Sequence, residues 1–218
     1  MSFLVWASAD IGSNIYLKSV CKKFCKERVI ALTFDDGPDE LMTPKVLDLL
    51  LKYNIKATFF LIGSKVDKNP DLVKRIFNEG HIVANHTYSH SGIFPLSNAK
   101  YVKNEIEKCR NSIKTIVGET PILFRPPFGV TNPIIGRVVN SLGLKTIGWS
   151  IRSLDTLNVP EKISSRVLRL LHPGAIILLH DRCVNTDIVL DNLINEIHKR
   201  KYSFITLEQI LKHDAYEN

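Results

Sequence analysis

A strict alternation of short apolar runs and amphipathic stretches is the feature that most constrains the fold of this chain. From residue 28 onward, each apolar run ends in polar residues and is followed by apolar side chains at helical spacing. The run at residues 175–179 is apolar at every position, which is typical of a strand buried on both faces of a parallel sheet. Such alternation implies right-handed crossovers and favours one α/β domain with parallel strands.

Seven strand–helix units are predicted, with strands at residues 29–34, 57–62, 81–84, 122–124, 144–149, 175–179 and 203–205. Helices are predicted to begin at a Thr43 cap, at Asn69–Pro70 and at a Ser97 cap, to occupy residues 133–142, 160–171 and 187–199, and to end with a short helix after the last strand. This pattern favours a barrel, with a doubly wound open sheet as the alternative. We divide the chain into an N-terminal extension at residues 1–27 and a single domain at residues 28–218.

Composition excludes several classes of protein. The 218 residues are 44% hydrophobic and 23% charged, which is ordinary for a globular chain and not for a disordered one. The formal net charge is +7, but the basic residues are scattered, so we expect no nucleic-acid partner. No apolar run approaches the roughly 20 residues of a membrane span, and residues 1–9 do not resemble a signal peptide. Four cysteines are too few for a disulfide framework. We also expect the protein to be a monomer.

Ionisable residues follow five of the predicted strands. They are Asp35 and Asp36, His86 and His90, Arg125, Asp155, and His180. The carboxyl ends of parallel strands meet at one edge of a sheet, where ligands bind in α/β folds. Because five separate strand ends carry such residues, the sequence predicts one functional site built from all of them.

Two histidines four residues apart suit one metal ion. His86, His90 and a carboxylate from Asp36 would leave coordination positions open, which is typical of a catalytic metal rather than a structural one. Asp35 would then stay free as a general base for a water molecule. The alternatives are a chance His-x-x-x-His spacing and a solvated Asp-Gly-Pro turn.

His180 has three interpretations. It could be the general acid that protonates a leaving amine, with Asp155 holding its tautomer and its charge. It could also be a buried structural histidine or, as a last possibility, the partner of Cys183 in a thiol hydrolase. Arg125 precedes two prolines and could hold the base carboxylate through a bidentate pair.

Four segments together resemble, in order, the motifs of the polysaccharide deacetylases, carbohydrate esterase family 4. They are Thr33–Pro38, His86–His90, Arg125–Gly129 and Leu178–Asp181. Over about residues 28–212, the resemblance implies a distorted (β/α)7 barrel and makes residues 28–218 the catalytic domain. It also implies metal-dependent removal of N-acetyl groups from amino-sugar polymers such as peptidoglycan or chitin-like N-acetylglucosamine.

The resemblance also implies a role for each matching residue. Asp35 matches the base, and Asp36, His86 and His90 match the ligands of a divalent metal, with zinc expected first and cobalt, nickel or manganese as alternatives. His180 matches the acid with Asp155 as its partner, and Arg125 positions the base. The substrate would contact the backbone N–H of Phe128, the side chain of Leu178 and Pro127. Members of the family usually work at the cell envelope or outside the cell.

The fourth motif departs from the family pattern. The family commonly shows Asp-x-x-Asp-Trp where this chain has Arg152, Asp155 and Thr156 at the three fixed positions. Asp155 is retained, but the tryptophan that helps to wall the acetyl pocket is not, and Trp149 lies too early in the motif to replace it directly. The substrate therefore stays open. An O-acetyl polysaccharide esterase of the acetylxylan type and a non-catalytic sugar-binding domain are the alternatives.

Overall fold

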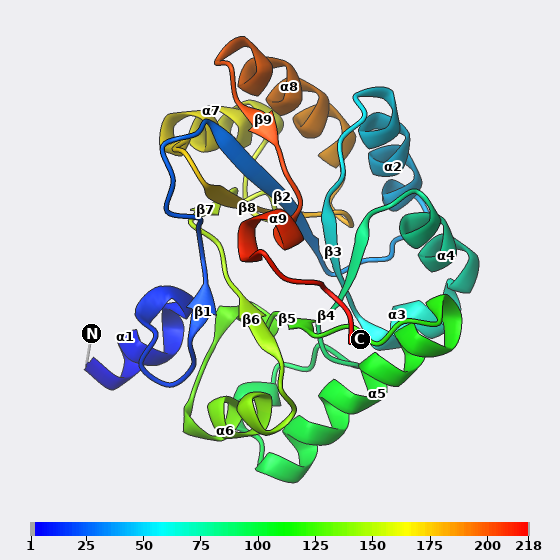
Figure 1. The fold of residues 1–218 in the computed structure, drawn as a ribbon, viewed down its shortest axis with the longest axis vertical. Helices are drawn as coiled ribbons and strands as arrows, with labels where there is room; N and C mark the ends of the chain where they lie inside the picture. Colours follow the sequence, from blue (N-terminus) through cyan, green and yellow to red (C-terminus); the bar gives the residue numbers. More distant parts are fainter. Residues whose placement is uncertain (1–2, 218) are drawn as a thin grey trace.

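The computed structural model describes residues 3–217, in which one curled sheet is surrounded by helices (Figure 1). Within this range the sheet has nine strands in the order β1-β6-β5-β4-β3-β2-β8-β7, with β9 beside β2. All of its strand ladders are parallel. The strands are β1 (Ser19–Val20), β2 (Val29–Asp35), β3 (Thr58–Leu61), β4 (Ile82–Asn85), β5 (Leu123–Phe124), β6 (Lys145–Ile147), β7 (Ile151–Arg152), β8 (Ala175–His180) and β9 (Ser203–Phe204).

Helices connect most of these strands and cover the outer side of the sheet (Figure 1). The α-helices are α1 (Phe3–Ala9), α2 (Met42–Lys52), α3 (Gly63–Lys68), α4 (Pro70–Asn78), α5 (Ala99–Val117), α6 (Pro133–Ser141), α7 (Pro160–Leu170), α8 (Thr186–Lys199) and α9 (Leu207–Leu211). Short 3-10 helices are η1 (Ile11–Ser13), η2 (Phe94–Leu96) and η3 (Pro127–Gly129). None of the helices in residues 3–217 is both long and apolar enough to cross a membrane.

The central strands are buried on both faces, and alternate side chains enter two different cores. Ile30, Leu32 and Phe34 of β2 pack into an outer cluster with the apolar faces of α2, α7 and α8. Ala31, between them, belongs to an inner cluster enclosed by the curl of the sheet. Burial on both faces explains why these strands are continuous apolar runs in the sequence.

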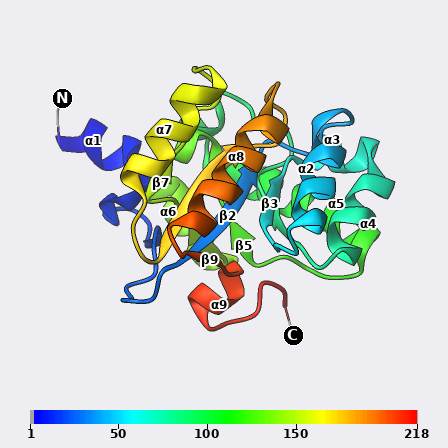
Figure 2. The ribbon, with the colours of Figure 1, turned by 90° about the horizontal axis from the view of Figure 1, so that it is seen from above.

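The interior of the curl is apolar at one end and polar at the other. At the amino ends of the strands, Leu207 and Ile210 of α9 join Ala31 and Phe60 in the inner cluster. In Figure 2, α9 lies below the sheet and covers this end. On the same inward face of β2, Thr33 and Asp35 follow Ala31 towards the carboxyl end, because side chains alternate along a strand. The polar site is therefore confined to the carboxyl end.

The sheet curls into the predicted distorted barrel, but its strand order leaves a seam between the edge formed by β1 and β6 and the edge formed by β7 and β8. Residues 19–23 bridge this seam. Val20 pairs with Ile147 of β6, Lys22 forms an antiparallel bridge with Ala175 of β8, and the Lys23 N–H donates to the Gly174 carbonyl at 2.8 Å. Part of the segment assigned to an N-terminal extension thus pairs with the sheet, and the division at residue 27 stays a prediction.

All seven predicted strands are present, while some local details differ from the sequence analysis. Strands β1 and β7 were not predicted, because two residues carry no periodicity. Asn98, not Ser97, caps α5 by accepting a hydrogen bond from the Tyr101 N–H. Thr43 is not a cap either. It lies inside α2, and Asp39 accepts hydrogen bonds from the backbone N–H groups that open this helix.

Candidate active site

The predicted residues meet at the carboxyl ends of the strands. Asp35 ends β2 and lies directly opposite His180, the last residue of β8, in the strand register. His86 follows β4, and Arg125 follows β5. Together these strand ends surround a cavity of about 230 Å³, lined by Asp35, Asp36, His86, His90, Phe128, Gly129, Trp149, Arg152, Thr156, Leu178, His180 and Arg182.

Asp36, His86 and His90 form a group with the geometry of a metal site. The Nε2 atoms of His86 and His90 lie 3.5 Å and 3.3 Å from Asp36 Oδ1. This oxygen is buried and finds no hydrogen-bond partner among residues 3–217. His86 Nδ1 lies 2.7 Å from the Arg125 carbonyl oxygen, to which it donates in the tautomer that leaves Nε2 free to act as a ligand. Two imidazole nitrogens and one carboxylate oxygen fit a divalent metal such as zinc.

The protonation of this group also suits a metal. Burial acts to raise the pKa of Asp36, but its contacts with His86, His90 and Arg182 outweigh burial and hold that pKa below its usual range. Burial, with the neighbouring charge of His86, lowers the pKa of His90 to about 4. At neutral pH the carboxylate is therefore charged and the His90 imidazole is neutral, which are the states that bind a cation.

The backbone around the motifs adopts left-handed conformations at residues other than glycine, which the sequence does not predict. Asp36, Thr87, His90 and Phe128 have positive φ angles of 73°, 65°, 49° and 61°. Such angles are uncommon outside glycine, and for a β-branched residue such as Thr87 they are outliers. Asn85 supports the loop, because its Oδ1 accepts a hydrogen bond from the Thr87 N–H at 2.8 Å. The loop conformations aim the histidine side chains at Asp36.

Arg125 holds the Asp35 carboxylate from inside the barrel. Its side chain is fully buried, and its Nη1 donates to Asp35 Oδ1 at 2.6 Å and to Thr33 Oγ1 at 2.9 Å. The expected bidentate pair is wrong, because Nε and Nη2 are bonded instead to the carbonyl oxygens of Ile147 and Gly148. Asp35 Oδ2 is left facing His86 Nε2 at 3.8 Å, on the side of the metal group.

Asp155 holds His180 through both of its oxygens. Oδ1 lies 2.7 Å from His180 Nδ1, and Oδ2 accepts the backbone N–H of His180 at 2.7 Å. Burial acts to lower the pKa of His180, but the hydrogen bond and the charge of Asp155 outweigh burial and raise that pKa. The side chain of Asp155 is buried, whereas His180 lines the cavity. The predicted pairing of these two residues is therefore present in the structure.

Apolar and aromatic groups form the wall of the cavity. The Phe128 ring lies edge-on to the His90 ring at a centroid distance of 4.8 Å, and Leu178 forms part of the lining. Trp149 also lines the cavity, although its early position in the fourth motif argued against a direct replacement. Pro127 is buried and is not among the residues that line the cavity, so its contact with substrate stays a prediction.

The sequence analysis assigned no role to two residues near the site, Arg182 and Asp181. Arg182 Nε donates to Asp36 Oδ2 at 2.8 Å, which leaves Oδ1 to face the histidines. Asp181 is fully buried, and burial raises its pKa to about 7. It accepts a hydrogen bond from the Thr43 hydroxyl, and a side chain at Gly37 would collide with its carboxylate. The available signal was their position, since both directly follow His180 at a strand end.

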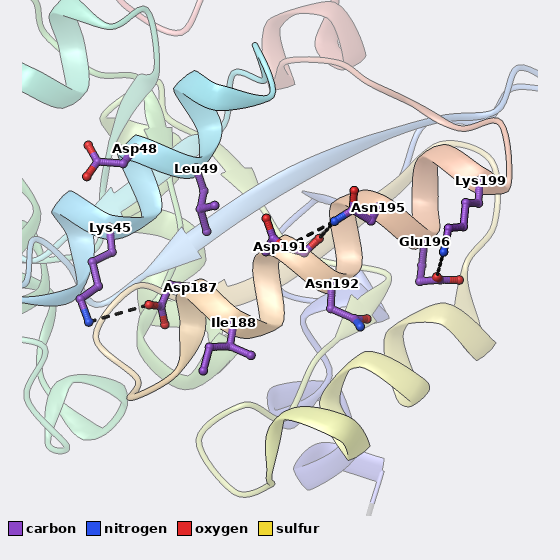
Figure 3. A pocket seen from close by; sticks show the side chains of 10 residues that line it. All are labelled: Lys45, Asp48, Leu49, Asp187, Ile188, Asp191, Asn192, Asn195, Glu196 and Lys199. Atoms are coloured by element: carbon purple, nitrogen blue, oxygen red, sulfur yellow. Dashed lines mark hydrogen bonds and ion pairs between the residues drawn. The ribbon is translucent and has the colours of Figure 1, made fainter.

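A larger cavity of about 880 Å³ lies elsewhere, between α2 and α8 (Figure 3). Its charged side chains form ion pairs, either with one another, as in Lys45–Asp187 and Lys199–Glu196, or with residues outside the lining, as in Asp191–Lys52. Among the residues that the structure describes, those that line this groove include none of the predicted motif residues. The smaller cavity holds the histidines and carboxylates that can do chemistry, so we assign the site there.

By fold and site, this is an α/β-barrel protein with a candidate metal centre at the carboxyl ends of its strands. Residues 22–147 match the family model described as polysaccharide deacetylase. The chain therefore belongs to the polysaccharide deacetylases, carbohydrate esterase family 4.

Three comparisons illustrate its relatives. The chain is 37% identical over 211 residues to the peptidoglycan-N-acetylglucosamine deacetylase PgdA of Listeria monocytogenes, covering 93% of this chain and 44%, less than half, of that protein. The crystal structure of the Bc1960 peptidoglycan N-acetylglucosamine deacetylase superposes with a TM-score of 0.86 at 30% identity, covering 100% of both chains. A family 4 acetyl xylan esterase from Clostridium thermocellum, solved with a cobalt ion, gives a TM-score of 0.78 at 35% identity, covering 84% and 90% of the two chains.

Proposed function

We propose that this chain is a metal-dependent hydrolase that removes N-acetyl groups from amino-sugar polymers of the peptidoglycan or chitin type. The observation that carries the proposal is the orphaned Asp36 Oδ1, buried between two histidine nitrogens and next to the Asp35 carboxylate. A buried carboxylate oxygen without a partner is costly unless a cation or a donor satisfies it. Asp36, His86 and His90 would hold the divalent metal, and we propose zinc.

The residues around Asp36, His86 and His90 have separate roles in the proposed amide hydrolysis. The metal, when bound, supplies a Lewis acid for the acetyl carbonyl and for a water molecule. Asp35 accepts the proton of the attacking water, because its Oδ2 faces the metal group while Arg125 holds its Oδ1. The Phe128 backbone N–H is the proposed donor to the oxygen that gains negative charge. Leu178 receives the methyl group of the departing acetate.

His180 supplies the proton that the leaving amine needs. It lies across from Asp35 in the register of adjacent strands, so an acetamide bound between the two has the base on one side and the acid on the other. Asp155 favours the protonated form of His180 and fixes the orientation of its ring. A cavity of about 230 Å³ is small for a whole oligosaccharide. We therefore infer that the polymer lies across the cavity mouth and inserts one acetyl group.

The relatives support a polysaccharide substrate, and the proposal extends their activity to this chain. The Listeria and Bc1960 relatives are named as peptidoglycan N-acetylglucosamine deacetylases. An O-acetyl esterase is the second candidate, because the acetyl xylan esterase shares the fold at 35% identity and Thr156 lines the cavity at the position where the family commonly has tryptophan. A non-catalytic sugar-binding role is the third, and the filled set of polar positions argues against it.

A substrate panel separates these candidates. Purified protein is incubated with N-acetylglucosamine oligomers, peptidoglycan and acetylxylan, with and without a chelator, and acetate and free amines are both measured. We expect acetate and amines in equal amounts from the amino-sugar substrates, and loss of both with the chelator. Acetate from acetylxylan alone would make the chain an esterase. No acetate from any substrate after metal reconstitution would overturn an enzymatic function. Bound metal is identified by elemental analysis of the protein as purified.

The proposal carries two further expectations. Because the substrates are polymers of the cell wall or of the exterior, we infer that the chain works at the cell envelope or outside the cell. We also expect a monomer, since the site is assembled from one chain. Fractionation of the source cells and light scattering of the purified protein test these two points.

A further inference from the structure

A second group of side chains that could bind a metal borders the first, and it adds a cysteine, Cys183, that has no role in the proposed reaction. Asp155, His180 and Cys183 each offer one ligand atom, and these atoms lie within 4.8 Å of one another. Ligand atoms around a tetrahedral zinc ion with bonds of about 2.0–2.3 Å lie roughly 3.3–3.8 Å apart. Asp155 Oδ1 and His180 Nδ1 lie 2.7 Å apart, so a metal between these two atoms needs them to separate slightly while Cys183 closes in. We call these three residues the thiol cluster.

Cys183 enters this cluster through the turn that follows β8. Its backbone N–H donates to the His180 carbonyl at 3.4 Å, and the Thr186 hydroxyl donates to the carbonyls of both residues. The side chain of Cys183 is half-buried, and His180 lines the open cavity. A cation that enters the cavity can therefore reach the cluster at His180 without unfolding of the turn.

The surroundings favour a cation over a free thiolate. Burial, and then the charge of Asp155, raise the pKa of Cys183 to about 11. The thiol is consequently protonated and unreactive at neutral pH, which removes support for a Cys183–His180 thiol hydrolase. A divalent metal reverses this preference, because a coordinating thiol loses its proton outright. The positive charge of Arg182 acts in the opposite direction on the pKa of Cys183, but Asp36 binds the Nε of Arg182.

We propose that Asp155, His180 and Cys183 form a second metal site, which takes zinc or the softer cadmium at higher concentration than the Asp36–His86–His90 site and inhibits the enzyme. Thiolate, imidazole and carboxylate together select such ions over magnesium or calcium. Metal on His180 Nδ1 breaks the hydrogen bond between this nitrogen and Asp155, and metal on Nε2 occupies the other ring nitrogen. In either case His180 cannot deliver a proton. The inhibition rests on the proposed role of His180, but the binding does not.

Cobalt binding tests the site without reference to activity. Cobalt(II) gives strong near-ultraviolet absorption when a thiolate is a ligand, and none from nitrogen and oxygen ligands alone. We expect the wild-type protein to bind two cobalt ions, with thiolate absorption developing only as the second one binds. Cys183→Ser should abolish this absorption and bind one ion, whereas Asp36→Ala should lose the other ion and keep the absorption. Cys25→Ser is the matched control, since Cys25 is a free cysteine outside the cavity.

Two outcomes would overturn the site: no thiolate absorption at millimolar cobalt, or absorption that persists in Cys183→Ser. A rate measurement then tests inhibition. In the wild-type protein, excess zinc or cadmium should lower the deacetylation rate, and Cys183→Ser should raise the half-inhibitory concentration at least about tenfold, because the soft ligand is lost. Equal inhibition of both proteins, together with normal thiolate absorption, would leave the metal site standing and remove its inhibitory role.

Discussion

Asp35 and Asp36 are neighbours in the sequence, but their carboxylates have different partners. Arg125 binds Asp35 inside the barrel, whereas Asp36 is held by Arg182 and faces the two histidines. The positive φ of Asp36 turns the chain between them, so two adjacent side chains of a strand end can serve one cavity. This geometry permits separate roles for two residues of the same type.

Replacing Asp35 by asparagine tests this division. Asp35→Asn should keep the metal and lose about 10²- to 10⁴-fold in kcat, because an amide cannot accept the proton of the attacking water. Metal content by elemental analysis and deacetylation rates check the two halves of the prediction. Asp36→Asn is the comparison and should lose metal. If Asp35→Asn loses its metal instead, the two assignments must be exchanged.

The pair of Asp155 and His180 predicts a change in the pH profile. Asp155 raises the pKa of His180, so the acid stays protonated to higher pH and the rate declines on the alkaline side as the pH rises through that pKa. Asp155→Asn should therefore move the alkaline limb of kcat/KM to lower pH. An alkaline limb that does not move would mean that another group titrates there.

The chemistry of the leaving group provides a separate test of His180. An amine must be protonated to leave, while the alcohol of an activated ester leaves without help. His180→Ala should therefore slow amide hydrolysis by about 10²-fold or more and slow hydrolysis of an activated acetyl ester much less. Parallel kinetics on an N-acetyl oligosaccharide and a nitrophenyl acetate provide the comparison. Equal losses on both substrates would assign His180 to binding or structure.

At the scale of elements, helix α6 meets the N-terminal segment through a glycine. A side chain at Gly136 would overlap the backbone carbonyl of Tyr16, which cannot move without the segment around it. Gly136→Ala should destabilise the protein by about 1–3 kcal/mol, although alanine is the better helix former. Thermal unfolding, with hydrogen exchange of the residues around Tyr16, measures the effect. Gly92→Ala is the control, since open space surrounds Gly92 in the described structure and the change should stay within about 0.5 kcal/mol.

The predictability of each element follows from the strength of its pattern. The apolar stripe of α5 repeats over several turns, and its members Val102, Ile106, Cys109 and Ile113 are all fully buried, as the spacing indicates. By contrast, β1 and β7 depend on contacts with distant segments, and no local pattern marks them. Caps fall between these cases, because the residue that caps α5 is Asn98, one position away from an equally suitable serine.

At the scale of the whole molecule, part of the N-terminal segment contacts the barrel. Residues 19–23 bridge β6 and β8, and Ala7 is fully buried. A chain that starts at residue 28 should therefore unfold at a lower temperature than the full chain, by roughly 2–4 °C for each kcal/mol of lost contact. Differential scanning calorimetry of the two chains provides the test. An unchanged melting temperature would support residues 1–27 as a separable extension.

The sequence was sufficient to predict the ionisable residues of the candidate site. It was not sufficient to predict the residues that surround them. Asp35, Asp36, His86 and His180 follow strands, and parallel strands place such residues together. The contribution of Arg182 depends on the path of the turn after β8, and that of Trp149 depends on how the chain bends between β6 and β7. These positions arise from tertiary packing, which a single sequence does not encode in any local pattern.

The left-handed residues of the motif loops have a consequence for any attempt to engineer this protein. Each costs on the order of 1–3 kcal/mol, and Thr87 and Phe128 carry side chains that suit this conformation poorly. Selection for heat resistance alone should therefore favour glycine or asparagine at these two positions. The same exchange would loosen the loops that aim His86 and His90. We expect heat-tolerant variants that alter these loops to lose activity. Substitutions in the outer helices that raise heat tolerance should leave the activity unchanged.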